Sequence, residues 1–139
     1  MNTDAINTLR FHCIGRFDVP GKQQGLGFIG KFRPFTELSY KDFEAIVNAS
    51  ETLYNETNEN DKIDKDIIYQ INGCAELLYN YALRDDAKLM KNKLITERER
   101  ADIGKMFIVL MGIVAQLTNP HNRSFNGQSP LQIYRNQIF

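Results

Sequence analysis

Hydrophobic residues are densest between positions 106 and 117, which read Met-Phe-Ile-Val-Leu-Met-Gly-Ile-Val-Ala-Gln-Leu. A membrane span needs roughly 20 apolar residues. This run is shorter and follows a charged stretch, so we expect a buried helix and no membrane span. Thr96 and Glu99 have the spacing of a capping box, and Pro120 cannot continue a helix. The pattern therefore predicts a helix over residues 97–118.

The second half of this helix is apolar on nearly all sides, so other parts of the chain must enclose it. Gly112 within the run also indicates that another backbone approaches closely there. We expect the cover to come from a phenylalanine-rich N-terminal segment and from residues 131–139. Exposure of Phe107 or Leu110 would instead indicate an oligomer that forms through this helix.

Two further helices are predicted before the central one. Ser39 has an aspartate three residues later, which is a helix-starting pair, and apolar residues at helical spacing extend that helix over residues 39–58. A polar break separates it from a helix over residues 63–84. Asp85 or Asp86 would then cap a short helical continuation.

The N-terminal part of the chain is less regular. Residues 3–10 are compatible with a short helix, whereas residues 11–35 hold five of the nine glycines and five of the nine phenylalanines. Glycine at this density opposes helix, so we expect an irregular arm, with a poor hairpin that pairs residues 11–17 with residues 26–32.

Near the other end, Ser129 before a proline and three residues before a glutamine predicts a short helix over residues 130–137. Together the patterns predict an all-α fold, a small helical bundle of three main helices with a short C-terminal helix. We expect one domain over residues 1–139, made of a Gly/Phe-rich arm (1–38), a three-helix core (39–118) and a C-terminal loop with the short helix (119–139).

Composition adds few constraints. The 139 residues are 24% charged and 42% hydrophobic with a formal net charge of zero, so attraction of the whole chain to nucleic acid or to an anionic membrane is not expected. The first residues lack the features of a secretory signal, which predicts a cytoplasmic protein. In that compartment Cys13 and Cys74 are expected to be free thiols.

The glycine-rich part of the arm resembles two phosphate-binding motifs. Residues 25–30 spell the GxGxxG pattern but lack the strand and helix that this motif needs on either side. As a P-loop, the same stretch has Phe32 where a hydroxyl must hold Mg²⁺. What remains is a backbone anion nest, the alternative being a loop that turns tightly against the bundle. The candidate anion-binding residues are Gly25, Gly27, Gly30, Lys31 and Arg33.

The region from Ser39 to Asp66 is acidic, with eight carboxylates against three lysines. Such a surface suits a basic protein partner, although acidic runs are more often only solvated. The candidate partner-binding residues are Asp42, Glu44, Glu51 and Glu56.

Catalytic chemistry is poorly provided for, because His12 and His121 are far apart in the sequence and no metal-ligand spacing occurs. We therefore expect no cofactor, no metal and no catalytic residue. The favoured function is a non-enzymatic protein-interaction domain, such as a small bacterial regulatory, antitoxin or immunity-type protein, with another protein as partner and a homo-oligomer as an open option. The alternative is a phosphate-, nucleotide- or other small-ligand-binding protein that uses residues 25–31.

Overall fold

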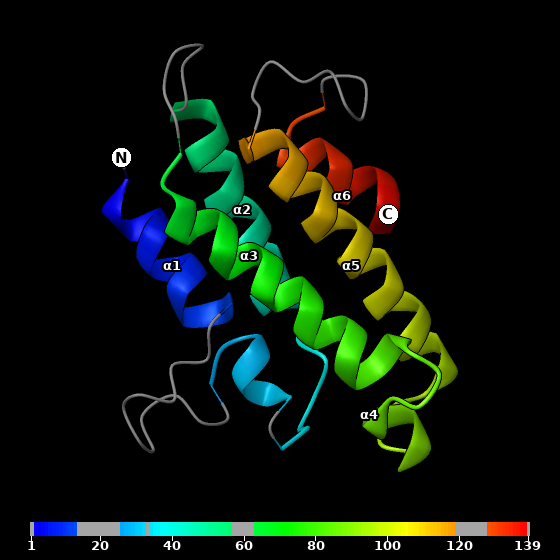
Figure 1. Ribbon diagram of the computed structural model, residues 1–139. Helices are drawn as coiled ribbons and strands as arrows, with labels where there is room; N and C mark the ends of the chain where they lie inside the picture. Colours follow the sequence, from blue (N-terminus) through cyan, green and yellow to red (C-terminus); the bar gives the residue numbers. More distant parts are fainter. Residues whose placement is uncertain (1, 14–25, 33, 57–62, 119–127, 139) are drawn as a thin grey trace.

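The computed structural model describes residues 2–13, 26–32, 34–56, 63–118 and 128–138 (Figure 1). In this part of the chain the fold is an all-α small helical bundle with a short C-terminal helix, which confirms the predicted class. The elements are α1 (Thr3–Cys13), the 3₁₀ turn η1 (Ile29–Lys31), α2 (Tyr40–Glu56), α3 (Lys65–Leu78), the π turn η2 (Tyr79–Leu83), α4 (Lys88–Lys91), α5 (Glu97–Thr118) and α6 (Pro130–Ile138).

The longer helices form a closed ring in which each packs on the next. Around the ring the order is α1, α2, α6, α5 and α3, and α3 packs on α1 again. α2 and α5 also touch across the ring, and α5 lies between α3 and α6 (Figure 1). The inner faces of all these helices contribute to one hydrophobic core.

Three helix starts follow the predicted caps. The Glu99 N–H donates to Thr96 Oγ1 at 3.0 Å, and the Thr96 N–H donates back to a Glu99 carboxylate oxygen at 2.9 Å. Ser129 and Gln132 make the same reciprocal pair before α6. The Asp42 N–H donates to Ser39 Oγ before α2. Each cap involves residues within one turn, which is why the sequence alone could reveal it.

The segment after α3 differs from the prediction. α3 ends in a π turn, in which the Arg84 N–H donates to the Tyr79 carbonyl, and α4 then has Ala87 as its N-cap without a side-chain hydrogen bond. Neither of the predicted aspartates caps α4, because Asp86 pairs with Arg84 and Asp85 is exposed on the surface. The predicted capping role of these two aspartates is therefore wrong.

The N-terminal region also differs. α1 continues to Cys13, three residues into the predicted irregular arm, and its Leu9 is fully buried where α1 packs on α2 and α3. The predicted hairpin is wrong over the described residues, because Phe11 is helical and Ile29–Lys31 forms a 3₁₀ turn. A helix that buries its apolar face in a bundle is stabilised mainly by that packing, so a weak local signal is enough.

The described phenylalanines of the arm are structural, as expected. Phe28 is fully buried, with its ring 5.4 Å from that of Phe32 and 5.3 Å from that of Phe43 on α2. The ring centroid of Phe43 in turn lies 5.9 Å from that of Tyr134 on α6. The aromatic rings of the arm therefore pack against α2. The neighbours of α5 are α3 on one side and α6 on the other.

Candidate protein-interaction face

The acidic residues of α2 that the sequence singled out are mostly engaged within the chain. A carboxylate oxygen of Asp42 lies 2.6 Å from Lys31 Nζ. Glu51 accepts a hydrogen bond from the Leu131 N–H in the first turn of α6, and Glu56 accepts one from the Asn2 N–H just before α1, both at 2.9 Å. Glu44 is exposed. Asp42, Glu51 and Glu56 therefore connect three other segments to α2, and partner binding through the acidic residues stays a prediction.

Asp42 and Lys31 are part of a polar cluster at the start of α2. Burial acts to raise the pKa of Asp42, but hydrogen bonds with Lys31 and Ser39 outweigh it and hold that pKa below its ordinary value. The same bond to Asp42 raises the pKa of Lys31. Burial lowers the pKa of His12, whose Nδ1 accepts a hydrogen bond from the Phe28 N–H at 3.1 Å. His12 is therefore a neutral acceptor that fixes the arm to the end of α1.

The glycine-rich loop makes the same kind of internal contact. Gly27 has a φ of +77°, and a Cβ added there would lie only 2.8 Å from the Phe11 carbonyl oxygen, so this glycine permits a close approach to α1. Gly30 is buried, and the Lys31 N–H donates to the Gly27 carbonyl at 3.3 Å. The Lys31 ammonium group also lies 3.5 Å from Glu37.

Gly25 and Arg33 lie outside the described residues. Among the candidate anion-binding residues that are described, Lys31 is paired with carboxylates, and the hydrogen bonds of the loop run into the chain. This geometry favours the tight structural turn over the anion nest.

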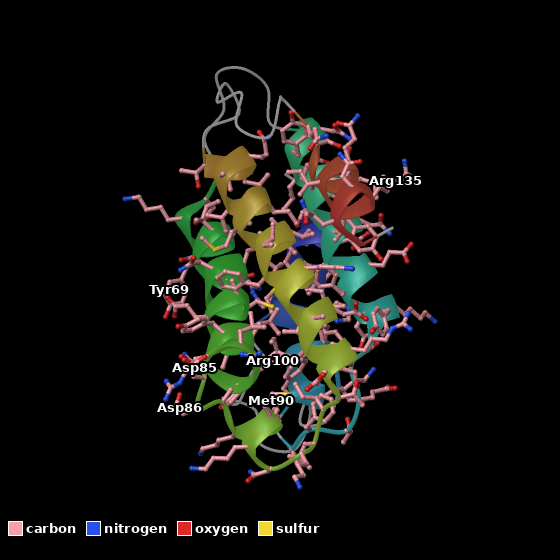
Figure 2. The ribbon with its side chains drawn as sticks, turned by 90° about the vertical axis from the view of Figure 1, so that its right-hand side faces the viewer. Tyr69, Asp85, Asp86, Met90, Arg100 and Arg135 are labelled. Carbon is pink, nitrogen blue, oxygen red and sulfur yellow. The ribbon has the colours of Figure 1, made fainter. Side chains whose placement is uncertain are left out.

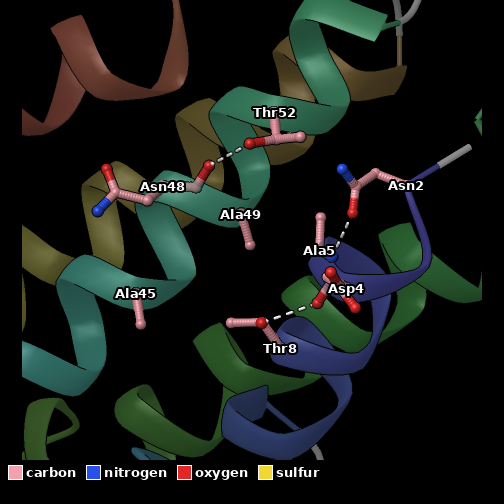
Figure 3. Close-up of a pocket in the computed structure, with 8 residues that line it drawn as sticks. All are labelled: Asn2, Asp4, Ala5, Thr8, Ala45, Asn48, Ala49 and Thr52. Carbon is pink, nitrogen blue, oxygen red and sulfur yellow. Dashed lines mark hydrogen bonds between the residues drawn. The ribbon is translucent and has the colours of Figure 1, made fainter.

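A hollow of about 390 Å³ lies between α1 and α2, and Figure 3 shows the residues that line it. Small side chains such as Ala45 and Ala49 line it, which accounts for the space. Its two threonine hydroxyls bond to their own helices, Thr8 to the Asp4 carbonyl at 2.8 Å and Thr52 to the Asn48 carbonyl at 3.1 Å. Each hydroxyl donates its proton to a backbone carbonyl, which is not a base that could activate it as a nucleophile.

The two cysteines belong to the hydrophobic core. Cys13 and Cys74 are both free and buried, in agreement with the predicted thiol state. Burial, together with contact with Cys13, raises the pKa of the Cys74 thiol, so little of the reactive thiolate forms at neutral pH. Over the described residues, His, Cys, Asp and Glu do not gather in any group of three that could hold a metal ion.

A larger groove lies between α3 and α5, with a volume of about 450 Å³. The rings of Tyr79 and Phe107 meet along it with their centroids 6.2 Å apart. We define the α3–α5 face as this groove and the exposed residues beside it. It comprises Tyr69, Asn72, Ala75, Glu76, Tyr79 and Asn80 on α3 and η2, and Phe107, Ile108 and Met111 on α5.

Several large side chains of the α3–α5 face are open to solvent. The exposed fractions are 78% for Tyr69, 48% for Tyr79, 44% for Ile108 and 39% for Met111. In Figure 2, α5 runs down the front of the bundle between α3 and α6, and Tyr69 points outward from α3. Large contiguous apolar patches are uncommon on the surface of a monomer, which makes this face the candidate interaction site.

This exposure corrects the prediction that the second half of α5 is enclosed. Leu110 is fully buried and Phe107 is half-buried, but Ile108 and Met111 lie on an uncovered outer side. α5 has a mean hydropathy of 1.5 over its most apolar 18 residues, of which 44% are buried. By length and composition it is thus able to cross a membrane, although in the bundle its inner side forms part of the core.

Comparison of the chain with protein-family models, with curated proteins and with solved structures found no match. The α3–α5 face was not among the residues that the sequence singled out. A signal for it is nevertheless present, since residues 101–118 contain a second line of small or apolar residues on the side of α5 opposite the core.

Proposed function

We propose that this chain is a non-enzymatic protein-interaction domain that binds its partner through the α3–α5 face. One observation carries the proposal, namely the groove of about 450 Å³ lined by exposed Tyr79 and Met111, with exposed Ile108 one turn before Met111 on α5. Aromatic residues and methionine are enriched in the buried centres of protein interfaces, and lysine and glutamate are depleted there. A small regulatory, antitoxin or immunity-type protein remains the class that we favour.

The shape and chemistry of the groove fit an apolar helix of the partner. Two parallel or antiparallel helices form a groove into which a third can place residues one turn apart. Glu76, Asn72 and Asn80 along the wall on α3 and η2 supply polar groups at its edge. This arrangement of an apolar floor with a polar rim is common in protein interfaces.

Site-specific photo-crosslinking tests the proposal. A photoreactive phenylalanine analogue is placed at position 108 in one variant and at position 41 of α2 in a control, since Ile108 and Lys41 are both exposed. We expect a discrete, saturable protein adduct from position 108 after irradiation in cells, and none from position 41. Equal and diffuse labelling from both positions would exclude the α3–α5 face as the docking site.

A further inference from the structure

We propose that the partner bound at the α3–α5 face is a second copy of this chain, which pairs antiparallel through the outer side of α5. The inference rests on the proposed function, because it names the occupant of the same face. It predicts a two-fold symmetric dimer in which the two α5 helices lie against each other.

The outer side of α5 carries a heptad-like line of residues. Small or apolar side chains recur at intervals of three and four, the spacing with which two helices pair. Each of these residues is exposed or half-exposed, so the core of the bundle does not account for the spacing. We call this line the α5 seam, and it comprises Ala101, Gly104, Ile108, Met111, Ala115 and Thr118.

Gly104 in the α5 seam has no evident role within one copy. A Cβ added there would meet only Leu83 Cδ2, at the ordinary contact distance of 3.8 Å. Glycine weakens a helix, and here neither a tight contact nor a positive φ requires it. Close approach of another helix from outside the chain gives it a purpose, since small residues let two helix backbones come near.

The order of sizes along the α5 seam is the same in both directions. The two large residues, Ile108 and Met111, lie at the centre, with small residues on either side. In an antiparallel pair, Ile108 of one copy faces Met111 of the second copy, and Ala101 faces Thr118. A two-fold interface must be complementary to itself, and this line meets that requirement.

The charge of Lys105 beside the α5 seam favours the antiparallel direction. Lys105 is exposed, whereas residues 106–118 carry no charged side chain. Antiparallel pairing sets Lys105 against the uncharged half of the second helix, whose C-terminal end has a partial negative charge. Parallel pairing would instead set the charged first halves of the two helices side by side.

The available area limits the strength of the dimer. From Ala101 to Thr118 the α5 seam is about 26 Å long, and with a helix diameter of about 10 Å it offers a strip of about 260 Å². A stable interface buries about 800 Å² on each partner. Including α3 roughly doubles the width of the strip, so the interface stays below the standard size and we expect weak, reversible association.

Sedimentation velocity on the full chain, from sub-micromolar to near-millimolar concentration, tests for the dimer. We expect the sedimentation coefficient to rise with concentration for the parent protein and to stay at the monomer value for Ile108→Glu. The control Lys41→Glu changes an exposed residue of α2 and should associate like the parent. Circular dichroism verifies that both variants are folded. A parent protein that stays monomeric throughout would overturn the inference.

Cysteine cross-linking tests the direction. Ala101→Cys mixed with Thr118→Cys should form a disulfide-linked dimer under mild oxidation by oxidised glutathione, which takes up the two electrons and two protons of the thiols. Each variant alone should not, because like positions lie about 26 Å apart in an antiparallel pair. Efficient linkage of either variant to itself would overturn the antiparallel arrangement. A monomeric parent that still gives a saturable adduct from position 108 would refute the dimer while leaving the proposed function standing.

Discussion

Three of the acidic side chains of α2 are engaged within the chain, whereas the apolar side chains of α5 continue onto its outer surface. On α2, Asp42, Glu51 and Glu56 each hold a different segment of the molecule. On α5, Met106 is fully buried and Met111 is 39% exposed. The comparison shows that three carboxylates of α2 bind other segments of the bundle, whereas α5 leaves large apolar side chains exposed.

The two methionines of α5 allow the sharpest test of this contrast. Met106→Ala should lower the free energy of unfolding by about 2–5 kcal/mol, because it leaves a cavity in the core. Met111→Ala should change it by less than about 0.5 kcal/mol at a concentration at which the chain is monomeric. Urea denaturation of both variants measures the difference. Similar losses would mean that the outer side of α5 is covered within one copy.

Two glutamates of α2 test the other half of the comparison. Glu51→Ala should lower the free energy of unfolding by about 1–2 kcal/mol, since the first turn of α6 loses its acceptor at the Leu131 N–H. Glu44→Ala is the matched control at an exposed position and should stay within about 0.5 kcal/mol of the parent. If the two variants were equally stable in urea, the anchoring role of Glu51 would be refuted.

Substitution of Gly104 should change the stability of the monomer and the strength of the dimer in opposite directions. Gly104→Ala should raise the free energy of unfolding by about 1 kcal/mol, because alanine favours helix and its Cβ meets only an ordinary contact. The same variant should dimerise more weakly than the parent. Gly73→Ala on α3 is a control with open space around the added Cβ, and it should stabilise by a similar amount without weakening association. A destabilised Gly104→Ala monomer would contradict the packing described for α5.

The smallest expected effect is a pH dependence of stability that arises from His12, in the polar cluster at the start of α2. Because burial lowers the pKa of His12, the unfolded chain takes up a proton before the folded chain does. The contribution of neutral His12 to stability is therefore complete above about pH 6.5 and is lost as the pH falls through that value toward the folded-state pKa. Thermal melts of the parent should show this loss.

His12→Asn is the matched variant for the pH effect, because its amide oxygen can accept the Phe28 N–H but does not titrate. The difference in melting temperature between the parent and His12→Asn should change with pH in this window. A constant difference would show that His12 does not titrate differently in the two states. Association through the α5 seam, which has no histidine, should not change over the same range.

The sequence revealed the features that depend on neighbouring residues. The caps at Thr96, Ser39 and Ser129 were predictable because their partners lie three residues away. The roles of Glu51 and Glu56 were not, because their partners lie 80 and 54 residues away in the sequence.

The candidate face depends on which side of α5 lacks a neighbouring helix, and the pattern of hydrophobic residues does not show this. Hydrophobicity showed that α5 belongs in a core, but only the folded ring shows which side of α5 has no neighbour among the described residues. The contact of Gly27 with Phe11 was not predictable either. The density of glycine indicated a turn, but not that the turn packs against α1.

The π turn Tyr79–Leu83 absorbs one residue of chain length at one point of the molecule. A π turn holds one residue more than an α turn, and the Ala82 and Leu83 carbonyls beside it both accept hydrogen bonds from Arg100. Deleting the exposed Asn80 would turn the bond from the Arg84 N–H to the Tyr79 carbonyl into that of a regular α turn, and the residues on either side would keep their faces. A chain one residue shorter at η2 should therefore keep the contacts of Arg100.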